Sequence, residues 1–364
     1  MQLTDDRKLA TLVLVVTGVV VWLDVWTGTS VRLVRLLVVL PAFVAGLGNV
    51  RQTTVVAGWV FVVVTTAALI PPYNMGDTLA AIVLELMFCG LSVGACHWRI
   101  RRESEIRRLR SAAVALQRQI LRPFPLRTAE LSVDGLYEPL QEDRLIGGDV
   151  YEVVASPYGT RVLIGDVQGK GLPAIGVGFA VLGAFRESAV REPTLTRVVD
   201  ALEEAVVRHN RFSKQSGDLE RFVTALVLSI DDGPRVQAVN CGHLQPQLLN
   251  ADVVSAIDLG TADVPLGMAE LTGGVRSTAD FGFPSAATLL ICTDGVTEAR
   301  GPAGDFYPLE ERLPRWTGLA PAELTEELRG DLTRFSRGVQ RDDIAMLALR
   351  RRPQPAAADE GSAG

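Results

Sequence analysis

The sequence predicts an all-α membrane bundle followed by an α+β domain. Two observations predict this division of the 364 residues. The first hundred positions hold long, nearly continuous runs of Val, Leu, Ala and Ile, which suit helices surrounded by lipid. After position 124, strand-like runs and helical patterns follow one another without regular alternation, which is typical of α+β folds and argues against a doubly wound sheet.

Four apolar stretches in the first region come close to the length that crosses a bilayer; they are residues 9–26, 34–47, 54–70 and 79–96. The second is short and contains Pro41. Their repetition argues against a single cleaved signal peptide, and the scarcity of polar surface argues against core helices of a soluble domain. We therefore predict a membrane domain over residues 1–97 with about four transmembrane helices, three or five being the alternatives.

Basic residues predict the orientation of these helices. Residues 97–127 contain nine arginines, whereas the loop at 71–78 contains no Lys or Arg. Because basic residues gather on the cytoplasmic side of membranes, we expect a multi-pass protein of the cell membrane with a cytoplasmic C-terminal domain. The formal net charge of −6 gives no indication of nucleic-acid binding.

A linker helix is predicted over residues 98–123. Its apolar residues recur three and four positions apart, which is the seam of a coiled coil; they are Ile106, Leu109, Ala113, Leu116 and Ile120. Pro123 and Pro125 follow and end the helix. Because the seam covers two heptads, it fits either a homodimer through this helix or packing against the domain that follows.

The α+β domain is predicted over residues 124–350. Strand-like runs cover residues 151–155, 161–167, 222–230, 235–240, 288–293 and 344–349. Helical patterns cover residues 173–191, 194–210 and 321–335, each with Pro at or near its first turn. The last segment, residues 351–364, is rich in Pro, Ala and Gly and is predicted to be disordered.

Four aspartates stand where a short apolar strand meets a glycine or a second carboxylate; they are Asp149, Asp166, Asp294 and Asp342. Each one alone is compatible with an ordinary turn. Burying four carboxylates close together is unfavourable without counter-charge, and carboxylate oxygens suit Mg²⁺ or Mn²⁺ rather than zinc. Because the chain has three histidines and none lies at ligand spacing from another, the recurrence predicts a carboxylate-only, two-metal hydrolytic site.

Five stretches, in this order, carry a family resemblance: Gly-Gly-Asp-Val-Tyr-Glu at 147–152, Gly-Asp-Val-Gln-Gly-Lys-Gly at 165–171, Asn-Cys-Gly-His at 240–243, Thr-Asp-Gly-Val-Thr-Glu-Ala at 293–299 and Asp-Asp-Ile at 342–344. They resemble the PPM-type (PP2C-like) protein serine/threonine phosphatases, in their bacterial SpoIIE-like branch. The resemblance implies an antiparallel β-sandwich flanked by helices, with two Mn²⁺ or Mg²⁺ ions at one end. It also implies hydrolysis of phosphoserine or phosphothreonine on a partner protein, which in this branch is usually an anti-sigma-factor antagonist.

The resemblance further implies a ligand set for the two ions: Asp149, Asp166, the backbone carbonyl of Val167, Asp294, Asp342 and Asp343. In this arrangement Asp166 bridges both ions, and Asp343 either binds an ion or holds Asp342. The paired ions activate a water molecule for attack on phosphorus, so no cysteine or serine nucleophile is needed.

Two positions depart from the family pattern, because Glu152 stands where aspartate is usual and Ala345 where threonine often follows the paired acids. Neither is expected to bind metal directly, so activity should survive both changes. One alternative is a catalytically inactive phosphatase-like receptor or scaffold that binds a partner protein. Another is a transporter or channel with a regulatory tail, which four short spans with few polar groups make less favourable.

Overall fold

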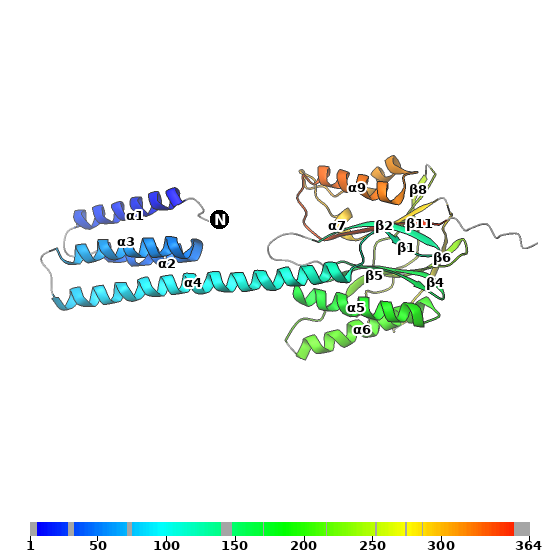
Figure 1. Cartoon of the computed structure of the whole chain (residues 1–364), viewed down its shortest axis with the longest axis horizontal. Coiled ribbons are helices and arrows are strands. Elements are labelled where there is room, and N and C mark those ends of the chain that lie inside the picture. Colours follow the sequence, from blue (N-terminus) through cyan, green and yellow to red (C-terminus); the bar gives the residue numbers. More distant parts are fainter. Residues whose placement is uncertain are drawn as a thin grey trace, which may run out of the picture. The chain divides into compact units, whose positions relative to one another are not determined.

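The computed structural model describes residues 6–27, 33–70, 75–139, 148–169, 171–215, 217–251, 253–273, 275–285 and 287–352. The chain divides into two compact units, Met1–Leu109 and Arg110–Gly364 (Figure 1). Residues 353–364 of the predicted tail lie outside the described residues. The predicted start of this tail at residue 351 is wrong, because Arg351 is buried and is the last residue of a strand.

The N-terminal unit is built from helices. They are α1 (Asp6–Thr27), a 3-10 helix η1 (Leu33–Val38) that continues into α2 (Val39–Leu47), α3 (Val50–Ala68) and α4 (Met75–Ile120), which extends into the second unit. By length and composition α1, α3 and the Thr78–Ile106 part of α4 could each cross a membrane. A further helix that meets the same criteria, Pro173–Arg191, lies in the C-terminal unit.

The second predicted span is shorter than its neighbours. It consists of six residues of 3-10 helix and nine of α-helix, which together extend about 25 Å at about 2.0 and 1.5 Å per residue. This is slightly less than the hydrocarbon thickness of about 30 Å. The expectation of about four spans therefore stays a prediction, supported by three long helices and one short apolar one.

Polar side chains near helix ends join the helices of the N-terminal unit. Asn49 and Gln52 form a capping box at the start of α3, with side-chain to backbone distances of 2.8 and 3.0 Å. Nε2 of Gln52 also donates to Oδ1 of Asp6 at 2.7 Å, which ties α3 to α1. On α4, Nη2 of Arg99 donates to the carbonyl oxygen of Gly48 at 2.6 Å and so satisfies a carbonyl at the end of α2.

One continuous helix of 46 residues, α4, covers both the fourth predicted span and most of the predicted linker helix. The predicted coiled-coil seam begins at Ile106, whose side chain is exposed. The side chains at 109–120 are outside the described ones, so dimerisation through this helix stays a prediction.

Two antiparallel sheets form the C-terminal unit. The six-stranded sheet has the order β1-β2-β11-β10-β7-β8, with bounds Leu126–Arg127, Leu131–Glu138, Ile344–Arg351, Thr288–Cys292, Gln247–Asn250 and Val253–Ala256. The five-stranded sheet has the order β3-β4-β5-β6-β9, with bounds Val150–Ser156, Gly159–Val167, Val223–Ile230, Arg235–Cys241 and Ala279–Gly282. All neighbouring strands pair antiparallel, so the predicted antiparallel sandwich is confirmed.

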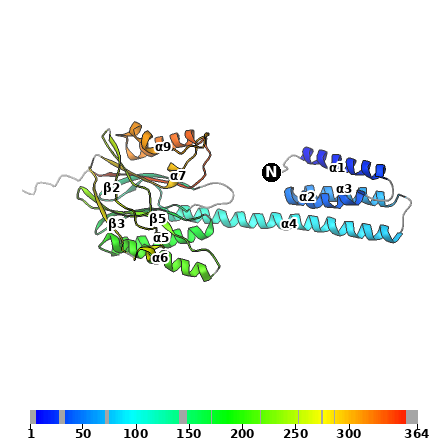
Figure 2. The same ribbon diagram turned by 180° about the vertical axis from the view of Figure 1, so that it is seen from behind.

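Helices cover the outer faces of both sheets (Figure 1). Helices α5 (Leu172–Arg191) and α6 (Leu195–Gln215) pack on β3 to β6, and from behind α5 lies next to β3 (Figure 2). Helix α9 (Pro321–Phe335) packs on β2 and β11 of the other sheet. The remaining short helices are η2 (Ala269–Thr272), α7 (Asp294–Thr297), α8 (Leu309–Arg312) and η3 (Leu313–Trp316).

Strand β11 shows why the chain forms these layers. Ala345, Leu347 and Leu349 join the core that lies between the sheets, whereas Met346 and Ala348 join the core beneath α9. Side chains alternate between the faces of a strand, so a strand buried on both faces must be apolar throughout. This explains the continuous apolar run that predicted the strand.

Candidate metal centre

The five predicted acids lie where strands of the two sheets end. In the five-stranded sheet, Asp149 directly precedes β3 and Asp166 is the penultimate residue of the antiparallel strand β4. In the six-stranded sheet, Asp294 opens α7 just after β10, and Asp342 and Asp343 directly precede the antiparallel strand β11. Antiparallel pairing therefore places the end of one strand beside the start of its partner in each sheet.

Two hydrogen bonds join the acids across the sheets. The backbone N–H of Gly148 donates to Oδ2 of Asp343 at 2.7 Å. The hydroxyl of Thr293 donates to Oδ2 of Asp149 at 2.6 Å. Because each bond connects the five-stranded sheet to the six-stranded one, the relative position of the sheets determines the geometry of the acids.

Glycines allow this close approach. A Cβ at Gly148 would lie 2.7 Å from the carbonyl oxygen of Val167 and 3.0 Å from Oδ1 of Asp166. A Cβ at Gly295 would overlap the carbonyl oxygen of Asp343. Packing therefore excludes any side chain at Gly148 and Gly295, which explains why glycine stands beside the aspartate in these two motifs.

The electrostatics of the cluster disfavour its own negative charge. Asp149 is 1% exposed, and burial, followed by the charges of Asp166 and Asp343, raises the pKa of its carboxyl well above the usual value. Burial also raises the pKa of Asp166 to about 7, with further contributions from Asp294, Asp342 and Asp343. The charges that act on these two carboxyls are all those of neighbouring carboxylates, so a bound cation would relieve the repulsion.

The donor set fits a hard divalent cation, since it consists of carboxylate oxygens with the carbonyl of Val167 beside them. In the part of the chain that the structure describes, no three His, Cys, Asp or Glu side chains are arranged to hold one ion as they stand. Shared ligation therefore requires some of these carboxylates to change rotamer. The charges of Asp294, Asp342 and Asp343 all act on Asp166, so these carboxyls form one electrostatic cluster.

The two residues that depart from the family pattern, Glu152 and Ala345, lie beside the acid cluster and contact other parts of the domain. Glu152 is 1% exposed and forms ion pairs with Arg186 of α5 at 2.5 Å and with Arg122 at 3.6 Å. The backbone of Ala345 forms two hydrogen bonds with Thr293. Its carbonyl oxygen accepts from the N–H of Thr293 at 2.9 Å, and its N–H donates to the hydroxyl oxygen of Thr293 at 3.0 Å. Sequence reasoning missed the contact of Thr293 with Asp149, although the Thr-Asp-Gly motif contains this residue.

A family model described as "Stage II sporulation protein E (SpoIIE)" matches residues 156–352, which is more than half of the chain. The chain belongs to the SpoIIE family. Its fold is that of PP2C phosphatase domains: the SiaA-PP2C domain of Pseudomonas aeruginosa superposes with a TM-score of 0.55 at 18% identity, covering 68% of this chain and 98% of that domain.

Two further relatives share part of this SpoIIE-family chain. Protein IcfG of Synechocystis sp. is 24% identical over 265 residues, which is 64% of this chain. The aligned part is 40% of IcfG, so the chain matches about two fifths of the length of that curated relative. The structure of the RsbU and RsbW domains of a Mycobacterium tuberculosis protein is 27% identical with a TM-score of 0.48, covering 62% of each chain.

Proposed function

We propose that this chain is a membrane-anchored, metal-dependent protein serine/threonine phosphatase. The observation that carries the proposal is the group of buried and half-buried carboxylates supplied by both sheets of a PP2C fold, where burial and then mutual repulsion raise the pKa of Asp149 and Asp166. In the proposed organisation residues 1–97 form the membrane domain, 98–123 the linker helix and 124–350 the catalytic domain.

The proposed ligands of two Mn²⁺ or Mg²⁺ ions are Asp149, Asp166, the carbonyl of Val167, Asp294, Asp342 and Asp343. When bound, the ions supply positive charge to the phosphoryl oxygens and activate water. The chain's own residues position these ligands. The hydroxyl of Thr293 orients Asp149, and the N–H of Gly148 holds Asp343.

Water is the proposed nucleophile because the nearest cysteine is unsuited to the role. Cys292 lies two residues before Asp294 and is buried. Burial, followed by the charges of Asp149 and Asp294, raises the pKa of its thiol to about 12. At neutral pH this thiol stays protonated, and a protonated thiol is a poor nucleophile.

The proposed substrate is a phosphoserine or phosphothreonine on a regulatory protein of the anti-sigma-factor-antagonist class, as membership of the SpoIIE family suggests. A cavity of about 440 Å³ is lined in part by Asp342, one of the five acids, and supports binding of the polypeptide around the phosphate. Gly295 and Asp342 line one part of it, and Thr333, Ser336 and Val339 line another.

The test of activity uses the full-length chain in detergent, an aryl phosphate and a phosphoserine peptide. We expect hydrolysis that requires Mn²⁺, stops with EDTA and is lost in Asp166→Asn. Binding of Mn²⁺ without turnover of either compound would contradict the phosphatase and favour a phosphatase-like receptor or scaffold.

Membrane anchoring with a cytoplasmic catalytic domain is proposed from the apolar helices and the arginines that follow them. Protease added to inverted membrane vesicles should degrade the catalytic domain, and protease added to right-side-out vesicles should leave it intact. The opposite pattern would reverse the proposed orientation.

A further inference from the structure

An arginine outside the acid cluster holds the loop that follows Asp166. Nη1 of Arg221 donates to the carbonyl oxygen of Gln168 at 2.6 Å. The N–H of Gln168 donates to the carbonyl oxygen of Phe222 at 2.9 Å. Both peptide groups of Gln168 are therefore bound by the two residues that precede β5.

One of these bonds fixes the carbonyl of Val167, and the other fixes the peptide plane that follows it. A peptide group is planar, so the N–H of Gln168 and the C=O of Val167 move together. Binding the N–H to Phe222 determines where the Val167 carbonyl lies, and the bond from Arg221 fixes the next peptide plane. The second plane joins Gln168 to Gly169, whose φ is +85°. Because glycine has more backbone freedom than other residues, the bond from Arg221 restricts a plane that would otherwise rotate more freely.

The arginine approaches the loop so closely that a side chain at position 169 is excluded. A Cβ at Gly169 would overlap Nη1 of Arg221. The same segment also lies close to Gly148, because a Cβ there would lie 2.7 Å from the Val167 carbonyl and 3.4 Å from that of Gly169. Residues 167–169 are thus packed between Gly148 and Arg221.

Helix α6 in turn holds Arg221. Asn210, which is 8% exposed, donates from Nδ2 to the carbonyl oxygen of Arg221 at 2.7 Å and accepts from its N–H at 3.1 Å. These paired bonds fix the backbone from which the arginine side chain extends. The arrangement connects α6 to the loop after Asp166 through two residues.

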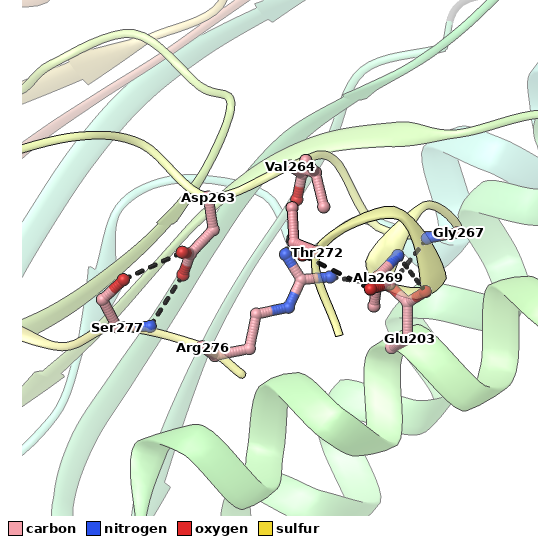
Figure 3. A network of polar contacts seen from close by, with 8 residues as sticks. All are labelled: Glu203, Asp263, Val264, Gly267, Ala269, Thr272, Arg276 and Ser277. Carbon is pink, nitrogen blue, oxygen red and sulfur yellow. Dashed lines mark hydrogen bonds and ion pairs between the residues drawn. The ribbon is translucent and has the colours of Figure 1, made fainter. Parts of the chain in front are cut away.

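Two turns earlier on α6, Glu203 holds a second loop through contacts with Gly267, Ala269 and Arg276 (Figure 3). Its carboxylate accepts from the N–H groups of Gly267 and Ala269 at 2.7 and 3.0 Å and pairs with the buried Arg276 at 2.8 Å. Leu266 of this loop bridges to Val223, the first residue of β5. Helix α6 therefore holds the chain before Phe222 through Asn210 and Arg221. It holds the chain after Phe222 through Glu203 and the loop that bridges to Val223.

We propose that Arg221 is a positioning residue of the metal centre, which sets the position of the Val167–Gly169 segment through the carbonyl of Gln168. Asn210 sets the position of Arg221 itself. This inference rests on the proposed function, because it concerns the loop that supplies Asp166 and the Val167 carbonyl as ligands. Residues that orient ligands without touching the metal typically change metal affinity or activity 10- to 100-fold when replaced.

The test measures Mn²⁺ affinity of the full-length chain in detergent by the electron paramagnetic resonance signal of free Mn²⁺. We expect Arg221→Ala to weaken binding about 10-fold or more. Arg221→Lys, which keeps one donor but not the planar guanidinium, should fall between that variant and the wild type. Asn210→Ala should weaken binding in the same direction, and it carries the test if Arg221→Ala does not fold.

Arg351→Ala is the matched control. Arg351 also donates to backbone carbonyls, those of Phe283, Asp231 and Arg235, but it ends β11, whose first residue follows Asp343. Its replacement should lower thermal stability and leave Mn²⁺ affinity unchanged. Affinity within two-fold of wild type in folded Arg221→Ala would overturn the inference alone. A wild-type chain that binds no Mn²⁺ would overturn the proposed function and the inference with it.

Discussion

Replacing Asp166 with asparagine should stabilise the metal-free catalytic domain while destroying its activity. The raised pKa of Asp166, about 7 against an ordinary 3.8, means that folding disfavours the ionised carboxyl. At about 1.4 kcal/mol per pH unit, this difference corresponds to about 4 kcal/mol at pH 8. The value is an upper bound, because asparagine also changes the hydrogen bond with Asp149.

The sign of the pH dependence follows from the same shift. Between about pH 4 and pH 7 the folded carboxyl keeps a proton that the unfolded one has lost. The wild-type domain therefore loses stability relative to Asp166→Asn as the pH rises through this range, and the difference in stability stays at its full size above it. Near pH 3 both states are protonated, so the wild type and Asp166→Asn should then differ little.

Urea unfolding of a fragment spanning residues 110–352 in EDTA provides the assay. The fragment starts where the second compact unit begins. Its single tryptophan, Trp316, is 9% exposed and reports unfolding by fluorescence. The free energy of unfolding of a domain of this size falls by about 3 kcal/mol per M urea. The full difference of about 4 kcal/mol would therefore raise the urea midpoint by about 1.3 M at pH 8.

Asp258→Asn is the control, because Asp258 is exposed and asparagine retains the side-chain oxygen that accepts from Gly260. It should leave the midpoint within about 0.2 M of wild type, as is usual for exposed substitutions. Added Mn²⁺ should reverse the order by stabilising the wild type more than Asp166→Asn. Equal or lower stability of Asp166→Asn at pH 8 without metal would refute the electrostatic reasoning.

Three other substitutions test the site from different directions. Thr293→Val removes the donor to Asp149 and should lower kcat about 10-fold or more, whereas Thr293→Ser should retain most of the turnover; equal rates would contradict an orienting role. Gly295→Ala places a Cβ on a backbone oxygen and should cost about 3 kcal/mol or more in urea unfolding, while Gly330→Ala within α9 should be neutral or stabilising. Val339→Asp in the cavity beside the acids should raise KM for a phosphopeptide several-fold and leave aryl phosphate hydrolysis unchanged; a parallel loss of both would place its effect on the chemistry instead.

The sequence predicted closely those elements with a clear apolar pattern. Helix α9 follows the predicted bounds, and β10 and β11 follow theirs closely, because most of their buried side chains are apolar. Strand β2 was missed although it pairs with β11 along its length. It contains Gly135, where a Cβ would lie 2.5 Å from the Met346 carbonyl, and glycine lowers strand propensity. Strand β8 was missed because its side chains are largely exposed.

The candidate site was predictable to a different extent. Short motifs identified the acids because each one combines a carboxylate with a glycine or a second carboxylate, and at Gly148 and Gly295 the packing requires the glycine. The contacts that hold them were not predictable, because the Thr293–Asp149 bond spans 144 residues and the Arg221–Gln168 bond spans 53. No local pattern records such a pairing, since it arises only when the two sheets and α6 have packed together.

The place of β11 has a consequence for how the protein is made. This strand is the last that the structure describes, yet it lies between β2 and β10 in the six-stranded sheet. A chain still being translated therefore has a split sheet, and it lacks Asp342 and Asp343 until the segment that begins β11 leaves the ribosome. The apolar N-terminal helices emerge long before that. The proposed membrane domain can therefore enter the bilayer before the acid cluster is complete.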